Sequence, residues 1–263
     1  MMNGMHRICL GLIVAALASS AAMADDDALS DVAVTPLQTA TLVTAAAPKR
    51  EAKLANFDGA KAPDDVRKLA DWIVTSGDNR GMNFVIVEKP AAVVFAFDPE
   101  GKILGTAPCL VGAAKGDGSF PGVGTMTLAQ ITPNMRTTPA GRFLSSLGPD
   151  LGKKDVLWVD YPDAISLHRV VNNVRSERRP ERLASPTPLD NRISWGCINV
   201  PPKFFDHVID PAFKGTTGLV YILPEVKSMK EVFPKYYDVE EPSGLQDVSV
   251  PVAPLDQAIS SGN

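Results

Sequence analysis

The sequence predicts a mainly β domain with a few short helices. Short runs rich in β-branched and aromatic residues recur between residues 83 and 224. Turn signals separate these runs, such as Asp98-Pro99-Glu100-Gly101. A sustained helical period occurs early, between Pro63 and Val74. Successive strands joined by tight turns indicate an antiparallel sheet.

The expected elements follow in chain order. From Val66, apolar residues recur at i, i+3, i+4, i+7 and i+8, which predicts a packing helix that Pro63 begins and Gly77 follows. A short helix is expected at 203–209, with His207 on the surface. The expected strands are 84–87, 91–97, 102–111, a strand led by the turn 136–143, 156–160, 165–168 and 219–223.

Composition and charge exclude some partners. The 263 residues carry a net charge of −4 and only 6% aromatic residues, which argues against nucleic-acid binding. The glycine-rich segment 112–124 is tempting as a phosphate cradle, but no Gly-Lys-Ser/Thr step opens a helix after it, so a mobile surface loop near the site is expected. We find no dinucleotide fingerprint and no metal-ligand cluster, and we expect no cofactor.

The first 24 residues have the pattern of a signal peptide. A weakly positive start is followed by an apolar run, 8–17, and by the small-residue cleavage site Ala22-Met23-Ala24. The apolar run is short for a membrane anchor, and no later segment is long and apolar enough to span a bilayer. The mature protein is therefore expected to be exported and soluble. The expected domains are a flexible lead-in (25–60), a catalytic domain (61–224) and a tail (225–263).

Cleavage would leave two cysteines, Cys109 and Cys197. An exported chain with two cysteines invites a disulfide, and that alternative stays open. The residues before Cys197 favour chemistry instead, because Ser194-x-Gly196-Cys197 places flexible backbone next to the sulfur, where N–H groups can face an oxyanion. Cys109 lies in an apolar run and is interpreted as a small buried hydrophobe.

We interpret Cys197 as a nucleophile and His168, at the end of an expected strand, as the base that activates it. Six arginines crowd the stretch between His168 and Ser194. This stretch is either a solvated loop whose charges pair with one another or a source of cations for the thiol and for substrate carboxylates. Substrate binding is assigned to Ser194, Trp195, Asn199 and Arg192.

These residues resemble the L,D-transpeptidase (YkuD-type) catalytic domain over residues 83–224. The most specific part is Ser194-x-Gly196-Cys197-x-Asn199 preceded by His168, with Thr138-Pro139-x-Gly141-x-Phe143 and Gly215-Thr216 in support. The resemblance implies a β-rich, β-sandwich-like domain, a cysteine acyl-enzyme nucleophile and a histidine base. It also implies that the main-chain carbonyl of Arg169 orients the imidazole, and that N–H groups near Gly196 and Cys197 bind the oxyanion.

The chain departs from the family pattern twice. Trp195 stands where the family usually has histidine, and the segment between His168 and Ser194 is longer than usual. The function implied is transpeptidation of peptidoglycan stem peptides with release of D-alanine, in the periplasm or cell envelope. Two alternatives stay open: a carboxypeptidase or other hydrolase on the same scaffold, and a non-catalytic wall-binding domain. The sequence leaves the acyl acceptor and the oligomeric state undetermined.

Overall fold

The computed structural model describes residues 52–240, all within the second of the two units of the chain, Lys49–Asn263. The predicted signal peptide, residues 25–51 of the predicted lead-in and the end of the predicted tail lie outside the described residues. Within 52–240, no helix is long and apolar enough to cross a membrane.

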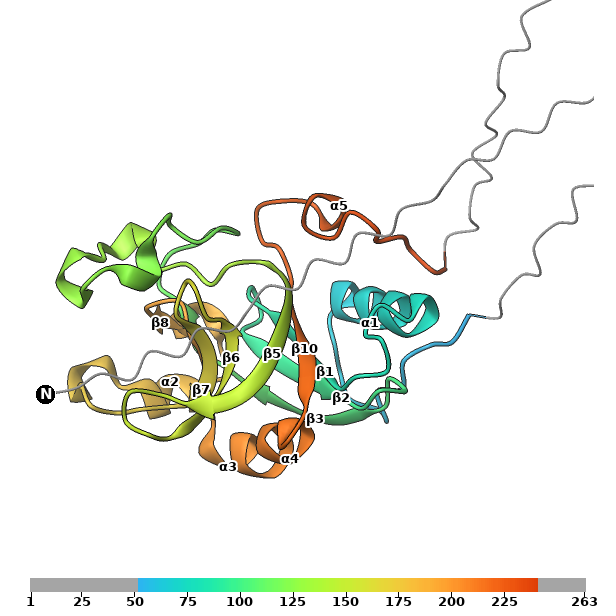
Figure 1. Ribbon diagram of the computed structural model, residues 1–263, viewed down its shortest axis with the longest axis horizontal. Helices are drawn as coiled ribbons and strands as arrows, with labels where there is room; N and C mark the ends of the chain where they lie inside the picture. The colour runs from blue at the N-terminus through green and yellow to red at the C-terminus, as the bar shows by residue number, and fades with distance from the viewer. Residues whose placement is uncertain (1–51, 241–263) are drawn as a thin grey trace, which may run out of the picture. The chain divides into compact units, whose positions relative to one another are not determined.

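A large mixed β-sheet forms the centre of the described domain (Figure 1). Its eight strands run in the order β3-β2-β1-β10-β5-β6-β7-β9, and β4 and β8 form a separate two-stranded sheet. The mainly β prediction is confirmed. The strands are β1 (Phe84–Glu88), β2 (Val93–Phe97), β3 (Ile103–Pro108), β4 (Val111–Gly112), β5 (Gly141–Pro149), β6 (Asp155–Asp160), β7 (Ile165–Arg169), β8 (Arg192–Ser194), β9 (Ile198–Val200) and β10 (Thr217–Ile222).

The helices are short, apart from the first. They are α1 (Asp64–Ser76), α2 (Arg179–Ala184), α3 (Pro202–Phe204), α4 (Asp210–Phe213) and α5 (Met229–Val232), with a π-helical turn, Phe205–Ile209, joining α3 to α4. Single 3-10 turns occupy Val123–Thr125, Leu128–Gln130, Pro133–Met135, Arg175–Glu177 and Pro188–Asp190.

The predicted antiparallel pairing of successive strands is confirmed, but the sheets also contain three parallel pairs, which were not predicted. The β1-β2-β3 and β5-β6-β7 runs are antiparallel, but β1 pairs with β10, β7 with β9 and β4 with β8 in parallel. The periodicity of apolar residues along a strand does not indicate which other strand it pairs with. A parallel pair needs a crossover of a dozen or more residues. The arginine-rich stretch, with α2, forms most of the crossover between β7 and β9.

Helix α1 forms where the apolar spacing predicted it. Asp64 and Asp65 in its first turn complement the positive end of the helix dipole. Gly77 ends it in the left-handed conformation (φ 71°) and donates its N–H to the carbonyl of Ile73. The apolar stripe that includes Leu69 and Ile73 is fully buried, so the helix serves packing, as expected.

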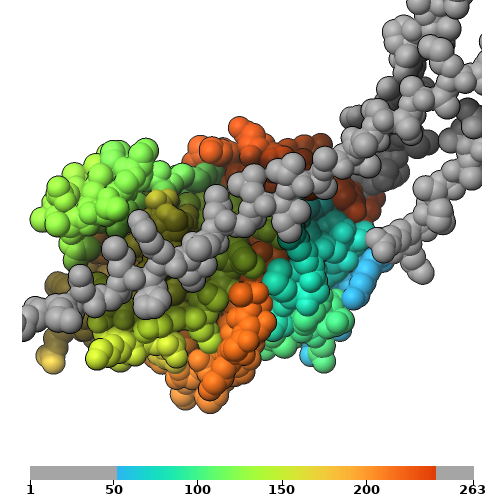
Figure 2. Space-filling model, viewed as in Figure 1, coloured from blue at the N-terminus to red at the C-terminus, as the bar shows by residue number. Residues whose placement is uncertain are grey.

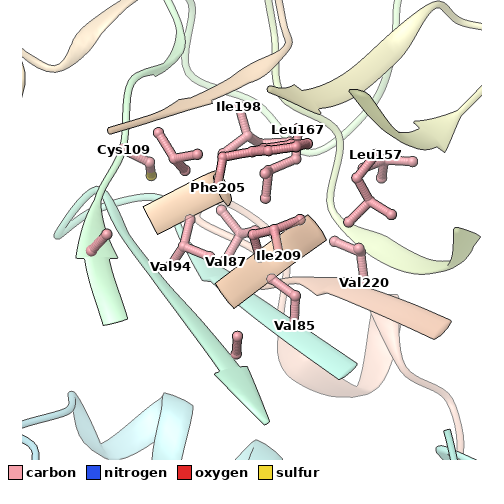
Figure 3. Close-up of a cluster of buried hydrophobic side chains, with 14 of the residues drawn as sticks. Val85, Val87, Val94, Cys109, Leu157, Leu167, Ile198, Phe205, Ile209 and Val220 are labelled. Carbon is pink, nitrogen blue, oxygen red and sulfur yellow. The ribbon is translucent and has the colours of Figure 1, made fainter. Parts of the chain in front are cut away.

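The central strands are buried on both faces. On one face, the helical run α3–α4 covers the sheet, and Phe205 and Ile209 pack among valines of β1, β2 and β10 (Figure 3). On the other face, α1 packs against aromatic residues of the same strands, among them Phe84 and Tyr221. This double cover explains why β1 is buried at every position and reads as a continuous apolar run rather than an alternating one.

Residues 225–240, which fall in the predicted tail, are packed on the domain. Phe233 is 3% exposed, Trp72 donates its indole N–H to the carbonyl of Lys235, and its ring contacts Tyr236 edge to face. The space-filling view shows this red segment lying against the cyan residues of α1 (Figure 2). The segment therefore completes the core over α1.

Candidate active site

Cys197 lies in the tight connection between β8 and β9. Gly196 adopts a φ of 130°, which disfavours any other residue type. A Cβ atom at this position would lie 2.8 Å from both the Ile165 side chain and the carbonyl oxygen of Thr137. Glycine is therefore required here both by backbone conformation and by space. The connection presents a free thiol that is half-buried.

His168 reaches the thiol from β7, the strand next to β9. His168 and Asn199 are direct partners in the parallel register. The Nδ1 atom of His168 donates to the main-chain carbonyl of Arg169 at 2.8 Å. This bond places the proton of a neutral imidazole on Nδ1 and leaves Nε2 as the basic nitrogen. The Arg169 carbonyl thus lies where the resemblance implies, while the Arg169 side chain pairs with Asp206.

The surroundings of Cys197 favour its thiolate. Burial would raise the pKa of the Cys197 thiol, but the hydrogen bond and charge of His168, with the N–H and hydroxyl of Ser166, lower it below the ordinary value. Burial likewise would lower the pKa of His168, and Cys197 and the Arg169 carbonyl raise it. The two groups therefore stabilise each other as a thiolate and an imidazolium. The Sγ atom lies 3.7 Å from Ser166 Oγ and 3.5 Å from the Ala164 carbonyl oxygen.

Asn199 joins the base to the arginine-rich crossover. When the imidazole is neutral, the Asn199 Nδ2 donates to His168 Nε2 at 3.1 Å, and the Asn199 Oδ1 accepts from Arg179 Nη1 at 2.7 Å. Arg179 is also paired with Glu177 at 2.6 Å. Because the guanidinium can only donate, it fixes which end of the Asn199 amide faces the imidazole. Sequence reasoning did not single out Arg179 from the other arginines.

The crossover arginines mostly pair within the chain. Arg169 pairs with Asp206, Arg179 with Glu177, and Arg182 donates to the main-chain carbonyls of Glu177 and Asp190. These contacts fit the self-paired alternative for those arginines. Arg179 differs from the others because it also contacts Asn199.

Ser194 builds the connection that carries the thiol. Its buried hydroxyl donates to the Cys197 carbonyl at 2.6 Å and accepts from the Gly196 N–H at 3.1 Å. Thr138 Oγ1 donates to the Gly196 carbonyl at 2.7 Å, and it accepts from the Gly112 N–H. The peptide between Gly196 and Cys197 is therefore held at its carbonyl end. In a trans peptide the Cys197 N–H points the opposite way.

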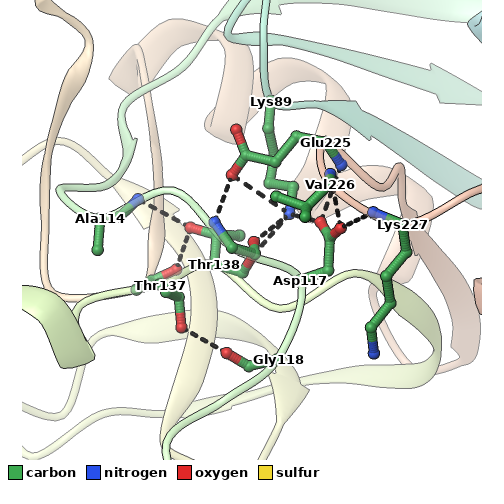
Figure 4. Close-up of polar contacts among 12 residues, drawn as sticks. Lys89, Ala114, Asp117, Gly118, Thr137, Thr138, Glu225, Val226 and Lys227 are labelled. Carbon is green, nitrogen blue, oxygen red and sulfur yellow. Dashed lines mark hydrogen bonds and ion pairs between the residues drawn. The ribbon is translucent and has the colours of Figure 1, made fainter.

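A buried charge cluster supports Thr138 from behind (Figure 4). Lys89 Nζ donates to Asp117 at 2.6 Å, to the Gly116 carbonyl at 2.7 Å and to the Thr138 carbonyl at 3.1 Å. Asp117 in turn accepts the main-chain N–H groups of residues 225, 226 and 227. The Lys89 and Asp117 side chains are 0% and 1% exposed. This cluster gives the glycine-rich loop a buried anchor, which the expectation of a mobile surface loop did not include.

Arg192, expected to bind substrate, belongs to the edge of the same cluster. Its guanidinium pairs with Glu225, which also lies 3.6 Å from Lys89, and it donates to the carbonyls of Gly112 and Ala114 at 3.4 Å. These partners tie β8 to the glycine-rich loop and to the last segment. A contact between Arg192 and substrate stays a prediction.

Trp195 and Arg136 form a stack beside the nucleophile connection. The Arg136 guanidinium carbon lies 3.7 Å from the centre of the Trp195 ring, and both side chains are half-buried. Trp195, at the position where the resemblance implies a histidine, therefore lies next to a cation.

A hollow of about 280 Å³ opens beside the base, with His168, Arg169, Val170, Lys154 and Asp155 among its lining residues.

Cys109 is a free thiol in the segment between β3 and β4, and its side chain is buried in the core (Figure 3). Burial raises the pKa of the Cys109 thiol, which makes it a poor nucleophile. Both cysteines of the described residues are free in this structure.

His207 is exposed, as expected. Within 52–240, no group of three or more histidine, cysteine or acidic residues is arranged to hold a metal ion.

Comparison with known proteins gives matches among solved structures alone. No family profile and no curated protein matches the chain. The similar structures include an L,D-transpeptidase from Mycobacterium smegmatis (15% identity, 54% of this chain, 58% of that chain, TM-score 0.33). They also include the catalytic domain of the L,D-transpeptidase from E. faecium (16%, 54%, 98%, 0.31) and a helical cell shape determining protein from Campylobacter jejuni (16%, 56%, 49%, 0.36).

The chain therefore spans less than two thirds of the mycobacterial and Campylobacter structures. These neighbours include L,D-transpeptidases, the family that the cysteine motif resembles. The identities are low, and all three TM-scores are below 0.5.

Proposed function

We propose that the protein is an exported, cysteine-dependent acyltransferase that acts on peptidoglycan stem peptides as an L,D-transpeptidase. The observation that carries the proposal is the pair formed by Cys197 and His168. The thiol is free, half-buried and lowered in pKa, and the imidazole beside it is oriented through Nδ1 by the Arg169 carbonyl. Cys109 is also free, but it is fully buried and burial raises the pKa of its thiol.

In the proposed reaction, His168 Nε2 accepts the proton of Cys197, and Sγ attacks the carbonyl carbon of the third stem residue. The Gly196 N–H already donates to Ser194. We therefore assign the oxyanion to the Cys197 N–H, whose peptide Thr138 holds at the carbonyl end. The C–N bond to the terminal D-alanine then breaks, and the imidazolium protonates the leaving amine. An amine of a second stem attacks the thioester and restores the thiol.

The covalent intermediate tests this proposal directly. Purified protein is mixed with tetrapeptide stems, quenched in acid and weighed by intact-protein mass spectrometry. We expect one acyl adduct, located on Cys197 by peptide mapping, and no adduct on Cys197→Ala. The matched control is Cys109→Ala, which removes the other described cysteine and should keep the adduct. An adduct that persists in Cys197→Ala, or that disappears in a folded Cys109→Ala, would contradict the assignment.

A further inference from the structure

Among the half-buried arginines near the site, no carboxylate pairs with Arg136 or with Arg182, and Arg182 donates instead to the main-chain carbonyls of Glu177 and Asp190. Arg169, Arg179 and Arg192 each lie within ion-pair distance of an acidic side chain. Among the described residues, Arg136 has no such partner. Its Nη2 donates to the Ile131 carbonyl at a long 3.4 Å, and its Nε is buried without a hydrogen-bond partner.

Trp195 holds this cation at the nucleophile connection. The guanidinium lies 3.7 Å from the ring centre, within the range of a favourable cation–π contact. A stack of this kind uses the face of the guanidinium and not its N–H groups, which point outward in the plane of the group. Arg136 also lies two residues before Thr138, whose hydroxyl donates to the Gly196 carbonyl, so its backbone is held close to the Cys197 connection. The position of the cation is therefore set by contacts on both sides.

A partly desolvated cation without an anion is costly unless a ligand supplies the negative charge. We propose that Arg136, held by Trp195, binds a carboxylate of the substrate. A planar guanidinium suits such a group because it can donate two parallel hydrogen bonds. The inference rests on the proposed function. A stem peptide offers two sources of the carboxylate: its C-terminus, on the leaving residue, and the side chain of its third residue.

Binding is measured in the Cys197→Ala background, so that the result does not depend on turnover. Three tetrapeptides are titrated by calorimetry: the unmodified peptide, one amidated at its C-terminus and one amidated at the side-chain carboxylate of the third residue. We expect one of the two amidations to weaken binding by about 10- to 100-fold, the range of a hydrogen-bonded charge pair. The amide that weakens binding identifies the source.

Arg136→Gln in the same background should weaken binding of the unmodified peptide. The dissociation constants of the unmodified peptide and of the amide that binds more weakly to the parent protein should then be nearly equal. Arg136→Lys keeps the charge without the fork and should give an intermediate ratio. Trp195→Phe should keep most of the discrimination, and Trp195→Leu should lose it.

Equal binding of all three peptides, or discrimination that survives in a folded Arg136→Gln, would overturn the inference. Discrimination that depends on Arg136, in a protein that forms no acyl adduct with Cys197 present, would support the inference and count against the proposed function.

Discussion

Replacing Asp117 by alanine is expected to lower the free energy of unfolding by about 3–5 kcal/mol, the largest effect on stability that we predict. The change leaves the buried Lys89 ammonium without its closest anion, at 2.6 Å, and three main-chain N–H groups of residues 225–227 without their acceptor. Urea unfolding measures the difference. The packing of residues 225–240 on the core should weaken with it.

The matched control is Asp206→Ala, which breaks a partly exposed pair with Arg169 and should cost no more than about 1 kcal/mol. A loss in Asp117→Ala no larger than in this control would show that the buried cluster does not stabilise the fold.

The same carboxylate gives the stability a dependence on pH. Burial would raise the pKa of Asp117, but Lys89 and the three N–H groups lower it to about 2. In an unfolded chain the pKa of aspartate is about 3.9. Because the folded-state value is the lower one, the stabilisation from Asp117 is complete above about pH 4 and is lost as the pH falls towards about 2. Asp117→Ala should remove this part of the acid dependence.

The second large effect concerns the base. His168→Gln is expected to lower kcat by about 100- to 10,000-fold, the usual contribution of a positioned acid or base. It should also move the alkylation of Cys197 by iodoacetamide to higher pH. His168 lowers the pKa of the thiol against the opposing effect of burial, so its removal raises that pKa and less thiolate forms at neutral pH.

The control for the base is His207→Gln, which changes an exposed histidine of the described residues and should leave both measurements unchanged. An alkylation profile in His168→Gln identical to that of the natural protein would show that His168 does not activate the thiol.

Local patterns predicted most of the elements. Helix α1 and strands β1, β2, β6, β7 and β10 carry their signals in their own residues, as apolar period or β-branched runs. Local patterns did not predict which strands pair with each other or which distant segments pack together. The parallel pairing of β7 with β9 depends on the crossover between them, and no local pattern records it. Likewise, Phe233 packs on α1 from more than 150 residues away, so its segment resembled a loose tail.

The candidate site divides in the same way. Cys197 and His168 could be found from the motif, because their residue types and spacing carry the chemistry. The residues that fix their geometry could not. Thr138 contacts the connection from 58 positions away, and Arg179 contacts Asn199 from 20 positions away. Nothing in the sequence distinguishes Arg179 from its neighbouring arginines. Because lysine side chains are rarely fully buried, the sequence did not indicate that Lys89 lies in a buried charge cluster.

The central claim, that Cys197 transfers a stem-peptide acyl group to an amine, is tested most directly by the products. Tetrapeptide muropeptides are incubated with the protein and, in parallel, with Cys197→Ala, and the products are identified by mass spectrometry. We predict a cross-linked dimer with loss of D-alanine, and its absence with the variant. Tripeptide without dimer would indicate the hydrolase instead. A dimer formed equally by Cys197→Ala would contradict the claim, because the thiol would then have no part in the reaction.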